Sequence, residues 1–161
     1  MHLNLDAIQL RGRQRAKALA FANRQCDQWG LAMPACEPLV MDFGRDDYEH
    51  LGLIEYWIAN QTEEGYCGKY MFVLGGQRCP IHSHLEKHET FFIVKGKVGL
   101  TANGAEHVLN QGDSFALGPG LVHGFRGIGN ALILEVSSPC YIKDNKFEDP
   151  EIAGWAEKNC S

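Results

Sequence analysis

The chain has 161 residues, a length that predicts one domain able to fold without disulfides or a structural metal. Its net charge of −5 argues against nucleic acid as a partner, because phosphate binding requires a basic face. No apolar run is long enough to cross a membrane, and the N-terminus lacks the apolar core of a signal peptide, so we expect a cytoplasmic protein. Six cysteines occur without a CxxC pair and are expected to be free thiols.

Residues 4–29 are predicted to form an N-terminal helix. Asn4 or Asp6 can cap its start, and Gly30 is well placed to end it. The basic stretch RGRQRAK is expected to face water. The apolar face of this helix is expected to consist of Ile8, Leu19 and Phe21.

Short strand-like runs alternate with turn signals through most of the remaining chain. Asn103-Gly104 is a strong hairpin signal, and Lys95-Gly96 indicates another turn. This pattern predicts an all-β protein, an antiparallel sandwich or barrel, with a short helix in the stretch PEIAGWAEKNC at the end. Because no linker or repeat divides the chain, residues 1–161 are expected to be a single domain.

Potential metal ligands gather in the stretch GQRCPIHSHLEKHETFFIVKG, residues 76–96. His82 and His84 are two residues apart, so on a strand both imidazoles leave the same face. Glu89 lies at an odd spacing from His84 and can join them only if the chain bends in between. The later loop GPGLVHGF offers His123 as a fourth ligand.

Three imidazoles and one carboxylate suit Mn, Fe, Co, Ni or Zn rather than Ca or Mg, which prefer oxygen ligands. Four protein ligands leave positions for substrate only on a five- or six-coordinate ion, which is a catalytic arrangement. The alternative is that these are surface histidines near turns. His88 is adjacent to Glu89 and would point the other way on a strand, so it is left out of the ligand set.

The spacing Gly76-x5-His82-x-His84-x4-Glu89-x6-Gly96 resembles the first motif of the cupin superfamily. The stretch from Gly112 to His123 resembles the second motif. The resemblance covers roughly residues 65–138. It implies a small antiparallel β-barrel, a double-stranded β-helix or jelly roll, with a metal bound in its mouth.

Segments outside the two motifs extend this resemblance to nearly the whole chain. They are FGRDDYEHLGL at 43–53, GKYMFV around Lys69, and EVSSPCYIKDNKF at 135–147, and they are similar to cupin sugar isomerases of the D-lyxose ketol-isomerase type. This resemblance implies an aldose–ketose isomerase that interconverts D-lyxose and D-xylulose, or D-mannose and D-fructose, through an enediolate chelated by the metal. The divalent metal is expected to be Mn(II), with Zn, Co or Fe(II) as alternatives.

Isomerisation of this kind needs a base that moves a proton between C1 and C2. Glu135 lies in the apolar run ALILEVSS and is the candidate base, if its face of the strand lines the barrel. Lys69, which shares a strand face with Met71 and Val73, is its candidate partner. The alternatives are a solvent-facing glutamate and an exposed strand lysine.

Asp144 and Asn145 either bind sugar hydroxyls or cap the turn into the C-terminal segment. Two other functions compete with the isomerase. One is an Fe-dependent cupin dioxygenase, which has less use for a Glu–Lys pair, and the other is a non-catalytic sugar-binding cupin. We expect a homodimer, because small cupins commonly pair sheets and the N-terminal helix has an apolar stripe to bury. The expected partner is otherwise a small sugar, with no nucleic acid or membrane.

Overall fold

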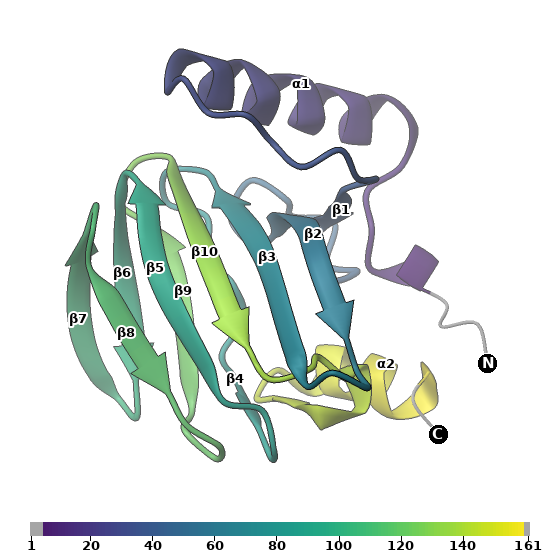
Figure 1. The fold of residues 1–161 in the computed structure, drawn as a ribbon. Helices are drawn as coiled ribbons and strands as arrows, with labels where there is room; N and C mark the ends of the chain where they lie inside the picture. The colour runs from purple at the N-terminus through teal and green to yellow at the C-terminus, as the bar shows by residue number, and fades with distance from the viewer. Residues whose placement is uncertain (1–4, 160–161) are drawn as a thin grey trace.

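The computed structural model describes residues 5–159 and contains two antiparallel β-sheets that face each other, with the two α-helices outside the sheets (Figure 1). The larger sheet has the order β1 (Leu39–Met41), β2 (Leu53–Gln61), β3 (Tyr66–Val73), β10 (Ala131–Ser137), β5 (Glu89–Lys95), β8 (Ser114–Leu117). The smaller sheet has the order β11 (Asn145–Phe147), β4 (His82–His84), β9 (His123–Gly127), β6 (Lys97–Ala102), β7 (Ala105–Asn110). The helical elements are η1 (Leu5–Ala7), α1 (Gly12–Gln28), η2 (Ile142–Asp144) and α2 (Pro150–Asn159). The predicted all-β, cupin-type architecture is confirmed in this mostly β sandwich.

The main core lies between the two sheets, because alternate side chains of each strand point inward. Met71 and Ile133 from the larger sheet and Leu100 and Phe125 from the smaller one are buried there. A second cluster lies on the outer face of the larger sheet, where Phe72 and other outward-facing residues pack under α1. The sheet is therefore covered on both faces along part of its length.

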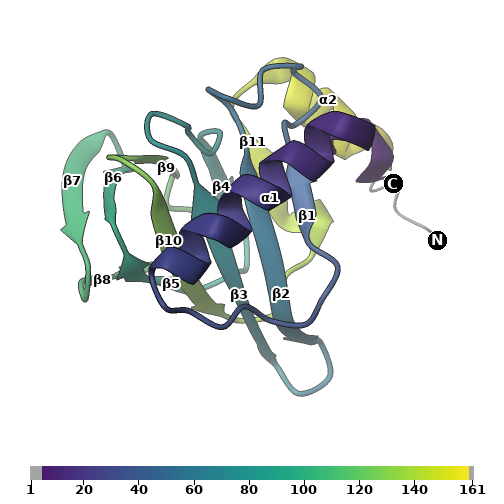
Figure 2. The same ribbon diagram turned by 90° about the horizontal axis from the view of Figure 1, so that it is seen from above.

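Helix α1 crosses the outer face of the larger sheet (Figure 2). Its buried residues are Ala22 and Cys26, while Phe21 is 39% exposed and touches Phe72 only at a ring edge, with centroids 6.5 Å apart. The predicted apolar face was therefore partly wrong, and Ile8 is not on the helix but in the core between the sheets. The stretch RGRQRAK is largely exposed, as predicted.

The helix begins at Gly12, not near residue 4 as the sequence suggested. After the short η1, Gln9 and Leu10 pair with β1 instead, because Leu10 N–H donates to Val40 O and Gln9 forms a bridge with Met41. A segment paired to a strand cannot also be helical. Asp6 forms an ion pair with Arg11 at 2.6 Å and does not cap α1, and Asn4 lies outside the described residues. The helix end is as predicted, with Trp29 as C-cap and Gly30 at φ +70°.

Both predicted turns occur. One closes a hairpin within a sheet, and the other connects the two sheets. Asn103 and Gly104 have φ of +48° and +79° and close the hairpin between β6 and β7, as two left-handed residues do in a type I′ turn. Gly96 joins β5 to β6, which lie in different sheets. It has φ +80°, and a Cβ there would lie 2.3 Å from Asn130 O. Only glycine fits where the chain crosses between sheets at this point.

No helix in the described part of the chain is long and apolar enough to cross a membrane. The cytoplasmic location expected from the sequence stays a prediction. The described cysteines are all free thiols, as predicted, and they are Cys26, Cys36, Cys67, Cys79 and Cys140. Cys160 lies outside the described residues.

Two alanine substitutions separate steric conflict from backbone strain. Gly104→Ala places a Cβ in open space and should cost about 1–2 kcal/mol, the penalty of a left-handed non-glycine residue. Gly96→Ala carries the same penalty plus that of forcing a methyl group against Asn130 O, about 1–3 kcal/mol more. Urea unfolding of the two variants measures the difference, and equal losses of stability would contradict the described crossing.

Candidate active site

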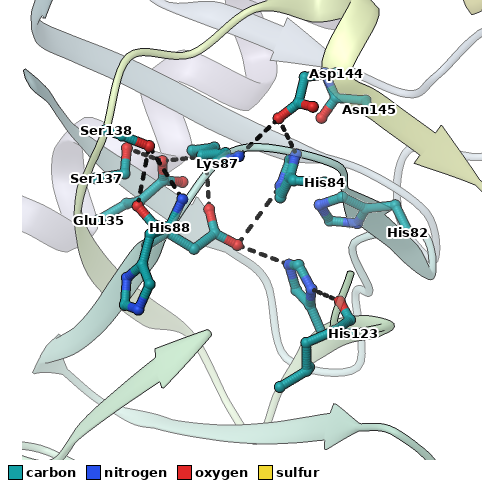
Figure 3. Close-up of polar contacts among 12 residues, drawn as sticks. His82, His84, Lys87, His88, His123, Glu135, Ser137, Ser138, Asp144 and Asn145 are labelled. Atoms are coloured by element: carbon teal, nitrogen blue, oxygen red, sulfur yellow. Dashed lines mark hydrogen bonds and ion pairs between the residues drawn. The ribbon is translucent and has the colours of Figure 1, made fainter. Parts of the chain in front are cut away.

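Three histidines from two neighbouring strands of the smaller sheet converge inside the sandwich (Figure 3). His82 and His84 alternate with Ser83 on β4, so both rings face inward, and His82 is paired in register with His123 on β9. One ring nitrogen of each histidine lies within 4.8 Å of the others, and all three residues are buried. The structure therefore contains a three-histidine group able to hold a metal ion.

Hydrogen bonds fix the tautomers of two of these rings. Nδ1 of His82 lies 2.8 Å from Pro80 O, and Nδ1 of His123 lies 2.9 Å from Leu121 O. A carbonyl only accepts, so each Nδ1 carries the proton and each Nε2 is left with a lone pair. Burial, followed by the neighbouring His123 and His84, lowers the pKa of His82 to about 3. Neutral imidazoles of this kind are good metal ligands.

Glu89 reaches the histidines because the chain bends between β4 and β5, as predicted. Asp144 stabilises the bend, accepting backbone N–H bonds from Leu85, Glu86 and Lys87 at 2.9–3.0 Å. Glu89 Oε1 then lies 2.8 Å from His123 Nε2 and 3.6 Å from His84 Nε2.

The contact between Glu89 and His123 brings two electron-pair donors together. Oε1 of Glu89 and Nε2 of His123 are both buried without a hydrogen-bond partner, as are both ring nitrogens of His84. The ammonium group of Lys87, 2.6 Å from Glu89 Oε2, favours the ionised form of this carboxyl. An ionised carboxylate facing imidazole lone pairs is stable only with a cation between them. The residues present therefore fit a bound divalent metal.

A chain of alternating charges continues from Glu89 along the inner face of the larger sheet. Lys87 Nζ lies 2.6 Å from Glu89 Oε2 and 2.5 Å from Glu135 Oε1. Lys69 Nζ lies 3.4 Å from Glu135 Oε2 and 2.7 Å from Glu55 Oε1. All five side chains are at most 10% exposed, so these ion pairs are little screened by water.

Both lysines in this series of ion pairs, Lys69 and Lys87, are charged. Burial alone would lower the pKa of Lys69, but Glu135 and Glu55 outweigh it and raise that pKa well above the ordinary value. For Lys87, burial and Lys69 lower the pKa, while Glu135 and Glu89 raise it, and the net shift is upward. Lys69 also lies over the Trp57 ring, 4.8 Å from its centroid, a favourable cation–π position. Neither ammonium group is a base in the resting protein.

The residues predicted from the sequence fall into two groups. Glu135 and Lys69 lie opposite each other on β10 and β3 with both side chains inward, so the alternatives of a solvent-facing glutamate and lysine are excluded. Asn145 lines the cavity described below, whereas Asp144 does not. The carboxylate of Asp144 accepts hydrogen bonds from the backbone of the bend, and its binding of a sugar hydroxyl stays a prediction.

Sequence reasoning missed two residues of the site, Lys87 and Glu55. Lys87 is two residues before Glu89. Two side chains at this spacing share a face only where the backbone is extended, and the sequence predicts a bend at this point. Glu55 lies in the apolar run LGLIEYWIAN, and a lone carboxylate in such a run was the available signal. His88, which was left out of the ligand set, is exposed and points away from the three histidines (Figure 3).

A cavity of about 560 Å³ opens beside the histidines. Its polar lining includes His82, His84, Glu89, Glu135 and Lys69. Its lining also includes residues of the segment 140–145, which follows β10. A volume of this size accommodates a small organic substrate next to the metal ligands.

The sandwich and its histidine group define a cupin, and the family model described as the cupin domain matches residues 69–137. The chain is also 30% identical over 141 residues to the D-lyxose/D-mannose isomerase of Thermosediminibacter oceani, covering 70% of this chain and 77% of that protein. The chain therefore belongs to the D-lyxose/D-mannose isomerase family of cupins, and the resemblance found in the sequence is confirmed.

Two solved structures resemble this one over almost their whole length. The L-ribose isomerase of Geodermatophilus obscurus is 16% identical, with a TM-score of 0.76 and coverage of 91% of this chain and 96% of that chain. The L-ribose isomerase of Cellulomonas parahominis, solved with L-ribose, is 16% identical, with a TM-score of 0.73 and coverage of 93% and 97%. At this identity the likeness shows the fold alone.

Single alanine substitutions test the histidine group. His82→Ala, His84→Ala and His123→Ala should each weaken metal binding by more than the roughly 10- to 100-fold that loss of a partner outside the ligand set costs. His88→Ala is the matched control, because its ring is exposed, and it should bind metal as the unmodified protein does. Metal content after dialysis, measured by mass spectrometry, gives the comparison. Full retention in the three variants would contradict the site.

Proposed function

We propose that this protein is a metal-dependent aldose–ketose isomerase acting on sugars of the D-lyxose and D-mannose type, with D-xylulose and D-fructose as the products. The observation that carries the proposal is Glu135, a buried carboxylate between two buried lysines, on the wall of the cavity that also contains the histidines. A proton-transfer enzyme needs such a base beside its metal. The similarity to the D-lyxose/D-mannose isomerase of Thermosediminibacter oceani supports the substrate class.

The proposed metal ligands are His82, His84, His123 and Glu89. Three imidazoles and a carboxylate favour Mn(II), with Zn, Co and Fe(II) as alternatives, and a five- or six-coordinate ion keeps positions for substrate oxygens. When bound, the metal supplies Lewis-acid polarisation of the sugar carbonyl.

Glu135 is proposed as the base that moves the proton between C1 and C2. Its Oε1 is occupied by Lys87 at 2.5 Å and by the Ser137 hydroxyl at 3.0 Å. Its Oε2 has only the longer contact of 3.4 Å to Lys69, so Oε2 is the oxygen with a lone pair available to the substrate. Lys87 and Ser137 thus orient the carboxylate, and Oε2 accepts the proton from one carbon and returns it to the other.

Lys69 is proposed to stabilise negative charge on the substrate oxygens as the enediolate develops. Glu55 Oε1 draws its ammonium group to 2.7 Å, away from Glu135, so that Lys69 does not neutralise the base by a close ion pair. Asn145, on the cavity wall, is proposed to bind a sugar hydroxyl. Glu55 and Lys87 are proposed as positioning residues.

The experiment uses protein stripped of metal and reloaded with Mn(II), incubated in D2O with D-lyxose or D-mannose and followed by NMR. We expect interconversion with the ketose and deuterium incorporation at C1 or C2. Glu135→Gln should reduce the rate at least about 100-fold, the lower range for loss of a general base, while the metal content is unchanged. Glu106→Gln, the same change at an exposed position on β7, is the matched control and should leave the rate unchanged.

Tight metal binding without turnover or exchange would refute the isomerase. Oxygen uptake with Fe(II) on addition of substrate would instead favour the dioxygenase. Retention of activity in Glu135→Gln would leave the isomerase standing but remove Glu135 as the base.

A homodimer is proposed as well, through the pairing of sheets that the cupin resemblance implies and not through the apolar stripe of the helix. The apolar stripe of α1 is already buried against its own sheet. The exposed apolar side chains on the outer face of the larger sheet, beyond α1, support pairing of two copies instead, and they are Ile58, Tyr66, Phe92 and Val136. Sedimentation equilibrium decides this, and a monomer at micromolar concentration would refute it.

A further inference from the structure

The cavity beside the histidines has two chemically different walls. The charged side chains Glu135, Lys69 and Glu55 lie on one part of the inner face of the larger sheet. Another part of the lining is apolar and consists of Leu39, Met41, Phe43, Phe147 and Ile152. We call these five residues the apolar wall. The established family resemblance does not account for it, because every carbon of an ordinary sugar carries an oxygen.

The apolar wall begins directly at the metal ligands. The ring of Phe147 lies 5.5 Å from that of His82, and the ring of Phe43 lies 6.1 Å from that of Phe147. In the register of β1 and β2, Leu39 is opposite Glu55 and Met41 is opposite Leu53. Glu55 is therefore the last charged residue on this inner face, and β1 presents only aliphatic side chains to the cavity.

The two walls act on different ends of a substrate. The reacting carbons, C1 and C2, belong beside the histidines and Glu135. A terminal hydroxymethyl group against the apolar wall would lose its hydrogen bonds to water without replacement. A terminal methyl group in the same place would lose no hydrogen bond and would remove apolar surface from water. A pentose would leave much of a 560 Å³ cavity without contact.

We infer that the cavity selects a deoxy sugar, a 6-deoxyhexose whose terminal methyl group packs on the apolar wall. The inference rests on the proposed function for the reaction at C1 and C2, and it specifies the substrate class of that same site. The opposite orientation, with the end of the sugar at the polar lining residues Asn60 and Thr62, is the rival arrangement.

Three sugars separate these arrangements, since they share their configuration from C2 to C4 and differ at the far end. They are D-lyxose, D-mannose and 6-deoxy-D-mannose. On the Mn(II)-loaded protein we expect kcat/KM for 6-deoxy-D-mannose to exceed that for D-mannose by roughly 10- to 100-fold, the range over which an apolar pocket discriminates against an added hydroxyl. Equal or lower values for the deoxy sugar would overturn the inference while leaving the isomerase intact.

Equilibrium binding provides a readout that does not depend on turnover. The Mn(II)-loaded Glu135→Gln protein should bind 6-deoxy-D-mannose at least about 10-fold more tightly than D-mannose, measured by titration calorimetry. The same preference in binding, with no turnover of any of the three sugars by the unmodified protein, would support the apolar wall and refute the proposed function. Equal binding of both sugars would overturn the inference.

A substitution in the wall should change the preference in the expected direction. Leu39 is only partly buried, so Leu39→Gln is tolerable and places a hydrogen-bonding group opposite Glu55. We expect the ratio of the two kcat/KM values to fall toward one, chiefly through a gain for D-mannose. Val108→Gln, at an exposed apolar position on β7, is the matched control and should leave the ratio unchanged. An unchanged ratio in a folded Leu39→Gln protein would overturn the inference.

Discussion

The site depends on one buried chain of alternating charges, Glu55–Lys69–Glu135–Lys87–Glu89. Removing Lys69 leaves Glu55 without its lysine, and removing Lys87 leaves Glu89 without its lysine. Breaking a buried ion pair in this way typically costs about 3–5 kcal/mol. These five side chains comprise three carboxylates and two ammonium groups, so together they carry one net negative charge. That charge lies beside neutral imidazoles, one of which has a pKa lowered to about 3. This negative charge favours a cation at the three-histidine group, which is able to hold a metal ion.

Sheet register brings the members of this chain together. Lys69 and Glu135 are directly opposite each other on β3 and β10, and Ser137 is opposite Glu89 on β5. A slip of one residue in either pairing would turn the charged side chains to the outer face. The bend before β5 has the same importance, because Asp144 fixes it through three backbone N–H groups. A residue predicted to touch sugar or cap a turn is thus part of the frame that aims Glu89.

Local signals were reliable where the chemistry is local. The Asn103-Gly104 hairpin, the end of α1 at Gly30 and the inward placement of Glu135 and Lys69 all follow from spacing and residue type. The start of α1 was wrong because pairing of Gln9 with Met41 depends on a strand thirty or so residues away in the chain, which helix propensity does not report. The expectation that the apolar stripe of α1 packs against a second copy was wrong for the same kind of reason, because the stripe packs against the chain's own larger sheet.

The sequence by itself determined the fold class and the three-histidine group, because strand alternation and the two motifs place these side chains on inward faces. Only the tertiary structure decided which charges meet. Lys87 and Glu55 join the site through pairings between segments that no local pattern connects. The apolar wall is likewise assembled from β1, β11 and α2, together with Phe43. Cavities and buried ion pairs are properties of packing, and packing is set by contacts between residues distant in the chain.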